Sequence, residues 1–167
     1  MLPLDLFILR HGESAKRLGR NNNLRSLTFA GHREVEEIAT SFKELGIKFD
    51  FIATSPIKGV HQTALIVARI LNQEKKIQDW NELRPEGNRQ ELYQKLSQLS
   101  QQSSLLIVGH GPYLIRMMYD LLLGGKSGQI VLKKTGLARI TITTYVPRLK
   151  GELKWLLTPT LIKNMGK

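Results

Sequence analysis

The sequence predicts an α/β layer fold built around a mainly parallel sheet. Short apolar runs alternate with segments of helical periodicity as far as residue 123. Several apolar runs stop abruptly at glycine, proline or histidine, as buried strands do where they meet a turn. No repeat or linker interrupts residues 1–167, so we expect a single domain with one core.

The N-terminal part predicts strand, loop, helix and strand in that order. Residues 4–9 are an apolar run typical of a buried strand, and the polar, basic residues 14–27 predict a long loop. Thr28 is a suitable N-cap for a helix over residues 30–45, which Gly46 ends. Residues 49–54 predict the second strand. The apolar positions of the helix share one face: Val35, Ile38, Ala39, Phe42 and Leu45.

The later elements follow from the same two periodicities. In chain order we expect a helix containing residues 60–71, a short strand over 76–80, a polar helix over 88–101, a buried strand over 104–108, a helix beginning at Pro112, and β structure over 129–133, 137–145 and 153–157. Because strands and helices alternate, the crossover connections place the loops that follow the parallel strands on one edge of the sheet. That edge is where α/β folds bind ligands.

Composition excludes several classes of protein. The chain has no cysteine, which rules out disulfides, thiolate nucleophiles and cysteine metal sites. It has no phosphate-binding glycine loop, no dinucleotide fingerprint, and no paired carboxylates beside its histidines, so we expect neither a cofactor nor a metal. No apolar stretch approaches the roughly 20 residues of a membrane span, and the N-terminus is a poor signal peptide. We therefore expect a cytoplasmic protein.

Positive charge is concentrated near the C-terminus. The net charge is +11, and residues 126–167 hold nine Lys and Arg residues against one acid. Such a field favours anionic partners, among them phosphates, acidic proteins, nucleic acid and anionic lipid. The chain lacks a zinc finger, a recognition helix and an aromatic RNA-binding motif, so we do not expect nucleic acid as a partner, nor do we expect a membrane.

Three strands end in unusual polar residues. These ends are Arg10-His11-Gly12, Ser55-Pro56 and Gly109-His110-Gly111. Because the carboxyl ends of parallel strands meet at one edge of the sheet, we expect His11 and His110 to lie together although they are far apart in sequence. Ser55-Pro56 is a common turn sequence, and we assign Ser55 no chemistry.

These residues suit phosphoryl transfer. A neutral imidazole is a competent nucleophile toward phosphorus, and the transferring group needs clustered cationic donors. Arg10, next to His11, supplies a bidentate guanidinium, and His110 can stabilise the same oxygens. Backbone amides near Gly12 and Gly111 can add donors. A buried structural histidine is the alternative reading of His11 taken alone.

Several blocks of the sequence resemble the histidine phosphatase (phosphoglycerate mutase-like) superfamily. Leu9-Arg10-His11-Gly12-Glu13 is similar to its opening motif. Further blocks follow in the right order: Leu27-Thr28 with Gly31, Thr54-Ser55-Pro56 with Gln62-Thr63-Ala64, and Val108 to Pro112. The chain length, Glu82-Leu83 with Pro85, and Trp155 to Pro159 resemble the short bacterial phosphohistidine phosphatase branch.

The resemblance implies a three-layer α/β/α fold and catalysis through a phosphohistidine, without metal or cofactor. His11 is then the nucleophile, Arg10 binds the transferring phosphate, and His110 stabilises the transition state. The implied substrate is a phosphorylated small molecule or a protein carrying phosphohistidine.

One position departs from the family pattern. A second phosphate-binding arginine usually stands four residues after the Ser of Ser-Pro, and this chain has Gly59 there. Lys58 and His61 flank the gap, and Arg25 of the early loop is a third candidate for the missing cation. The alternative is a weakened or inactive phosphate-binding protein, in which Gly59→Arg would raise activity.

The general acid is the least defined residue. Protonation of an alkoxide leaving group usually requires a carboxylic acid. Glu82 lies closest to the acid-bearing segment of the family, with Glu86 and Glu13 as rivals. A phosphohistidine substrate would relax the requirement, because imidazole leaves more easily than an alkoxide.

Overall fold

The computed structural model describes residues 3–17, 19, 21–99 and 103–167, which contain a six-stranded sheet in the order β3-β2-β4-β1-β5-β6. The strands are β1 (Leu4–Arg10), β2 (Phe51–Thr54), β3 (Ile77–Asp79), β4 (Ser104–Gly109), β5 (Leu137–Thr144) and β6 (Lys150–Leu157). The pairs β3-β2, β2-β4 and β4-β1 are parallel, whereas β1-β5 and β5-β6 are antiparallel. The mainly parallel sheet predicted from the alternating pattern is confirmed.

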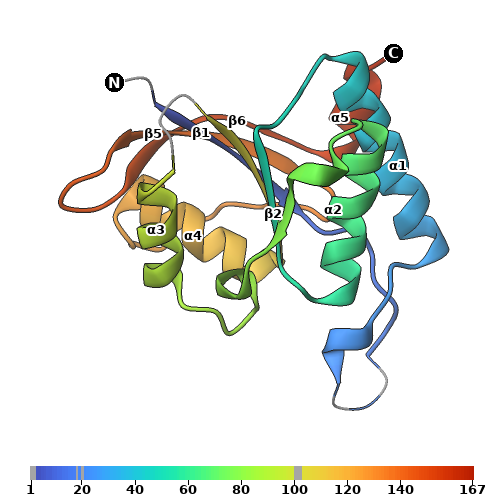
Figure 1. The fold of residues 1–167 in the computed structure, drawn as a ribbon, viewed down its shortest axis with the longest axis horizontal. Coiled ribbons are helices and arrows are strands. Elements are labelled where there is room, and N and C mark those ends of the chain that lie inside the picture. Colours follow the sequence, from blue (N-terminus) through green and yellow to red (C-terminus); the bar gives the residue numbers. More distant parts are fainter. Residues whose placement is uncertain (1–2, 18, 20, 100–102) are drawn as a thin grey trace.

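Helices cover both faces of the sheet (Figure 1). They are α1 (Phe29–Glu44), α2 (Lys58–Ile70), α3 (Arg89–Ser97), α4 (Gly111–Leu123) and α5 (Pro159–Met165), with short 3-10 turns at Asn22–Leu24, Glu74–Lys76 and Asn81–Leu83. The buried apolar residues form two clusters. Helices α1, α2 and α5 contribute to one cluster, and α3 and α4 contribute to the other. The three-layer α/β/α arrangement is confirmed.

Helix α1 forms for the reasons that its sequence indicates. Thr28 accepts a hydrogen bond from the backbone N–H of Gly31 at 2.9 Å, and the expected stripe from Val35 to Phe42 is buried. Leu45 was expected on the same buried face, but it follows the last turn and is 42% exposed. Gly46 then takes a positive φ of 70°, which reverses the chain without strain.

Residues 129–133 do not form the expected strand. A strand needs a partner, and both edges of β1 are already occupied, by β4 and by β5. The segment instead runs as an irregular loop to the carboxyl end of β1, where the antiparallel β5 begins. The alternation of Val131, which is 69% exposed, with the buried Leu132 therefore reflects a surface loop with one anchored side chain.

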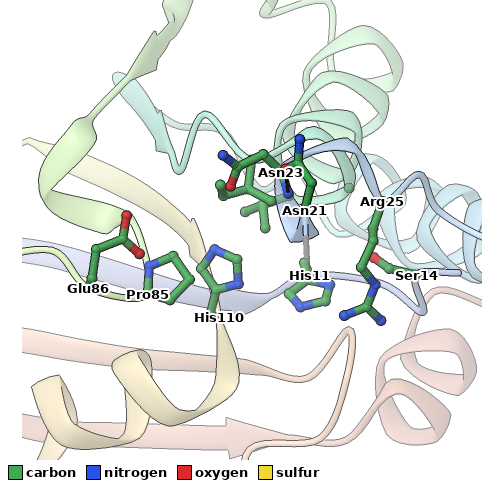
Figure 2. Close-up of a pocket in the computed structure, with 11 residues that line it drawn as sticks. His11, Ser14, Asn21, Asn23, Arg25, Pro85, Glu86 and His110 are labelled. Atoms are coloured by element: carbon green, nitrogen blue, oxygen red, sulfur yellow. Dashed lines mark hydrogen bonds between the residues drawn. The ribbon is translucent and has the colours of Figure 1, made fainter. Parts of the chain in front are cut away.

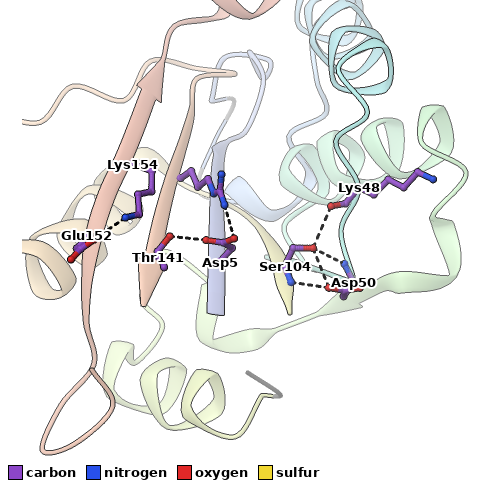
Figure 3. A network of polar contacts seen from close by, with 8 residues as sticks. Asp5, Lys48, Asp50, Ser104, Thr141, Glu152 and Lys154 are labelled. Carbon is purple, nitrogen blue, oxygen red and sulfur yellow. Dashed lines mark hydrogen bonds and ion pairs between the residues drawn. The ribbon is translucent and has the colours of Figure 1, made fainter. Parts of the chain in front are cut away.

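The two ends of the parallel strands differ in chemistry. At the amino ends, side chains pair among themselves: Asp5 accepts hydrogen bonds from Arg139 and Thr141 at 2.7 Å each, and Asp50 accepts one from the backbone N–H of Ser104 (Figure 3). At the carboxyl ends, the register aligns Arg10 with Gly109, and Thr54 with Val108. The residues that follow these strands, including His11, Ser55 and His110, therefore emerge at one edge.

Candidate active site

The two histidines meet at this edge, as the strand order requires. The ring centroids of His11 and His110 are 5.5 Å apart, with the ring planes at 67°. Both rings line one cavity of about 320 Å³ (Figure 2). Its other walls come from Ser14, Asn21, Asn23, Arg25, Ile57, Gly59, Val60, Pro85 and Glu86. A single small anion can therefore contact both imidazoles.

The hydrogen bonding of His11 shows which of its ring nitrogens carries a free lone pair. Nδ1 lies 2.6 Å from the carbonyl oxygen of Gly12. A carbonyl oxygen can only accept, so Nδ1 carries the proton and the neutral ring presents its lone pair at Nε2. The residue after the histidine thus fixes the tautomer that a nucleophile requires.

Both imidazoles are held in the neutral form. Burial lowers the pKa of His11, and the charges of Arg10, Lys134 and Arg25 lower it further, against the hydrogen bond to Gly12. Burial, together with the neighbouring His11, lowers the pKa of His110 to about 4. At neutral pH both rings are therefore neutral, which is the form in which an imidazole can act as a nucleophile.

These shifts predict a pH dependence of stability. Below pH 6.5 both histidines take up a proton in the unfolded chain. In the folded chain they stay neutral until the pH falls to their lower pKa values. The free energy of unfolding should therefore be greatest above pH 6.5 and fall as the pH decreases toward about 4. Urea unfolding across this range should show a shallower dependence for His110→Asn. An unchanged slope in this variant would contradict the assignment.

Ser55 orients His110, a role that sequence reasoning did not assign to it. The hydroxyl Oγ of this fully buried serine lies 3.2 Å from Nε2 of His110. Nδ1 is then the ring nitrogen that remains available to a ligand. The Ser-Pro turn at the end of β2 therefore contributes to the site by positioning, not by nucleophilic chemistry.

Arg10 lies beside the histidines and against helix α4. Its Nη1 donates to the carbonyl oxygen of Leu132 at 2.9 Å, and its Nε is buried without a partner in the described part of the chain. A Cβ on Gly111 would stand 2.7 Å from both Cζ and Nε of Arg10. Glycine at 111 therefore makes room for the guanidinium, which lies outside the wall of the cavity itself.

Gly12, which follows His11, does not offer its amide to a ligand. The N–H of Gly12 donates to Oγ1 of the buried Thr63 at 3.1 Å, and that hydroxyl donates to the carbonyl oxygen of Gly59. The neighbouring Gln62 accepts a hydrogen bond from the N–H of Leu27. Through these hydrogen bonds, Thr63 and Gln62 of helix α2 hold Gly12 and the early loop at Leu27 in place. Sequence spacing alone does not reveal this role.

Arg25 lies beside Gly59, the position at which this chain lacks the second arginine of the family pattern. A Cβ on Gly59 would meet Oγ of Ser14 at 2.5 Å and the carbonyl oxygen of Arg25 at 2.8 Å, so the early loop packs directly on this glycine. The Nε of Arg25 donates to the carbonyl oxygen of Ala15, and the half-buried side chain lines the cavity. Figure 2 shows its guanidinium on the His11 side of the site.

The other two candidates for the missing cation lie elsewhere. Lys58 is exposed at the start of α2, outside the walls of the cavity. His61 pairs through Nδ1 with Asp79 at 2.8 Å, at the outer strand β3. Of the three cations proposed to fill the gap, only Arg25 lines the cavity.

Glu82 also lies outside the cavity. Its Oε1 pairs with Nζ of Lys95 at 2.8 Å, and that ammonium lies over the ring of Trp80. Burial raises the pKa of Glu82, but the hydrogen bond and charge of Lys95 outweigh burial, so the net pKa is lowered. A carboxylate held ionised by a lysine is a poor proton donor.

Glu86 lines the cavity in place of Glu82. The turn from Glu82 to Gly87 is so tight that a Cβ on Gly87 would stand 2.1 Å from the carbonyl oxygen of Glu82. This turn carries Pro85 and Glu86 to the His110 side of the site (Figure 2). Glu86 is therefore the carboxyl group with access to a bound substrate from that side.

The described residues contain no group of three or more His, Asp or Glu side chains arranged to hold a metal ion. In the same part of the chain, no helix is long and apolar enough to cross a membrane.

Comparisons with known proteins agree with this geometry. Residues 6–88 match the model of the histidine phosphatase superfamily (branch 1), a stretch that includes Arg10, His11 and the Ser-Pro turn. An uncharacterised protein of Picosynechococcus sp. is 28% identical over 138 residues, which are 80% of this chain and 82% of the relative.

Solved structures share the fold over nearly the whole chain. The protein histidine phosphatase SixA complexed with tungstate has a TM-score of 0.82 at 23% identity and covers 93% of this chain and 97% of its own. Phosphoglycerate mutase of Bacillus anthracis (TM-score 0.70, 14% identity) covers 99% and 97%. A variant of phosphoserine phosphatase of Entamoeba histolytica in complex with phosphoserine (0.66, 17%) covers 93% and 98%.

Proposed function

The chain belongs to the histidine phosphatase superfamily, and we propose that it is a phosphatase that transfers a phosphoryl group to His11 and then to water. The observation that carries this proposal is the pair of neutral imidazoles facing one cavity, 5.5 Å apart. Release of inorganic phosphate from an aryl phosphate and from a phosphohistidine-bearing carrier protein is the direct test. Absence of release from both substrates would reject the proposal.

In the first step Nε2 of His11 attacks phosphorus and the bond to the leaving group breaks. The phosphoramidate on His11 is then attacked by water, which regenerates the neutral imidazole and releases phosphate. The backbone carbonyl of Gly12 holds the required tautomer throughout, because its hydrogen bond to Nδ1 does not involve the reacting atom. Neither step requires a metal or a cofactor.

Three groups surround the transferring phosphate in this proposal. Arg10 lies beside His11 with donors that its single bond to Leu132 leaves free. Arg25 approaches from the early loop, and His110 presents its Nδ1 from the end of β4. Fixed donors of this kind stabilise charge that develops on the phosphoryl oxygens. Arg25 lines the cavity next to Gly59 and can supply the cation that is missing at that position. The glycine is therefore no argument for a non-catalytic binding protein.

We assign the general acid to Glu86 in place of Glu82. Glu86 lines the cavity on the side of His110, where the leaving group of a phosphate attacked by His11 would depart. Glu86 is exposed, so this side of the cavity is accessible to a large substrate such as a phosphoprotein. A protein carrying phosphohistidine, whose imidazole leaves more easily than an alkoxide and so needs this acid less, is the finer form of the proposal.

The acid assignment predicts a dependence on the leaving group. Glu86→Gln should lower kcat on an alkyl phosphate by about 10²–10⁴-fold, because an alkoxide needs the proton. The same variant should have little effect on a nitrophenyl phosphate or on phosphohistidine. Glu82→Gln is the matched control and should show no such dependence. Equal losses on all substrates in Glu86→Gln would contradict a role in protonation.

A further inference from the structure

Thr135 occupies a backbone conformation that β-branched residues avoid. Its φ is +57°, in the left-handed region where glycine and asparagine are comfortable and threonine is strained. The residue is 1% exposed, so the strain is not at a surface turn free to relax. Strained, buried residues persist where the surrounding structure over-determines them, and they concentrate at functional sites.

Thr135 belongs to a turn that makes three hydrogen bonds with Arg10. The N–H of Arg10 donates to the carbonyl oxygen of Gly136 at 3.2 Å, and the N–H of Thr135 donates to the carbonyl oxygen of Arg10 at 3.0 Å. The guanidinium Nη1 donates to the carbonyl oxygen of Leu132. The turn from Leu132 to Gly136 therefore fixes both the backbone and the side chain of this arginine.

A carboxylate on α1 keeps the turn in place. The hydroxyl of Thr135 is within hydrogen-bonding distance of two acceptors, Oε1 of Glu34 and the carbonyl oxygen of its neighbour Lys134, and it donates its one proton to either of them. The first turns of α1 also contact the segment after the nucleophile: the N–H of Thr28 donates to the carbonyl oxygen of Glu13 at 2.9 Å, and a Cβ on Gly31 would stand 2.2 Å from the same oxygen. Helix α1 thus braces the His11 segment and the Arg10 turn together.

From this arrangement we infer that Thr135 and Glu34 are a positioning pair for Arg10. The inference rests on the proposed function, in which Arg10 binds the transferring phosphate. Glycine at 135 would satisfy the backbone without strain, but it would lose the hydroxyl that ties the turn to Glu34. The side chain of Thr135 therefore maintains the placement of the guanidinium at a cost in conformational strain, and it does not touch the substrate.

Thr135→Gly tests the pair, because it relieves the strain and so should still fold. We expect an unchanged or higher melting temperature, together with a fall of at least about tenfold in kcat/KM and in tungstate affinity measured by calorimetry. Glu34→Ala should lower kcat/KM and tungstate affinity to a similar extent. Glu34→Gln, which keeps an acceptor oxygen, should retain most of both. Asn72→Gly is the matched control, since Asn72 also has a positive φ (56°) but lies at the end of α2.

A double-mutant cycle separates positioning from a general structural effect. In an Arg10→Ala background, Thr135→Gly should cause no further loss of tungstate binding, because its effect passes through Arg10. Equal losses in both backgrounds, or unchanged binding in Thr135→Gly alone, would overturn the inference and leave the proposed function standing. If the wild-type protein neither binds tungstate nor hydrolyses a phosphate substrate, the proposed function fails together with the inference.

Discussion

His11→Ala should abolish both turnover and the covalent intermediate. Removing the nucleophile of a cooperative catalytic group costs about 10⁴–10⁶-fold in kcat. In the wild-type protein, rapid quenching during turnover of a ³²P-labelled substrate should trap phosphate on the chain. A phosphoramidate of histidine should be labile to acid and stable to base. The variant should show neither the label nor phosphate release.

His32→Ala is the matched control for this experiment. His32 lies on the exposed face of α1, where it is paired with Glu36, so its loss should leave the label and the rate unchanged. Label that persists in His11→Ala, or label that is stable to acid, would contradict a phosphohistidine at position 11. Label on His11 without release of phosphate would instead identify a protein that captures phosphate but does not hydrolyse it.

Arg25→Ala should lower kcat/KM by about 10²–10³-fold, the usual effect of removing one charged donor to a transition state. The reason is geometric: Arg25 is the cation that lines the cavity beside Gly59, while Lys58 and His61 lie elsewhere. Arg25→Lys should recover only part of the loss, because an ammonium cannot make the paired contacts of a guanidinium. Steady-state kinetics on one aryl phosphate is sufficient to measure both changes.

Arg33→Ala provides the control for charge alone, since Arg33 is an exposed arginine on α1 outside the cavity. An equal effect of both alanine variants would indicate a long-range field instead of a phosphate contact. Unchanged kinetics in Arg25→Ala would reject Arg25 as the second phosphate ligand.

The position of Arg25 also reverses the expectation for Gly59→Arg. If the chain were a weakened enzyme that lacks a phosphate ligand, this change would restore the ligand and raise activity. The structure shows that any Cβ at 59 meets Ser14 and the backbone of Arg25 within 3 Å. We therefore expect Gly59→Arg, and even Gly59→Ala, to displace the early loop and lower activity.

The layer architecture and the meeting of the two histidines could both be predicted from the amino-acid sequence. Both follow from local information: apolar runs that end in polar motifs define strands, and parallel strands bring their carboxyl ends to one edge. Since His11 and His110 directly follow such strands, their proximity did not depend on details of side-chain packing. Arg10 and the capping residue Thr28 were likewise readable from their immediate neighbours.

The polar residues that join the histidines at the cavity could not be predicted in the same way, because packing between distant segments selects them. The sequence favours Glu82 over Glu86 as the acid, but Lys95 of α3 pairs with Glu82 and leaves Glu86 at the cavity. Arg25 and His61 are likewise both candidates for the missing phosphate-binding cation in sequence, but the ring of His61 pairs with Asp79. Residues 129–133 alternate like a strand, but no free edge of β1 remained for them. These outcomes depend on contacts between residues distant in the chain, which local periodicity and spacing do not encode.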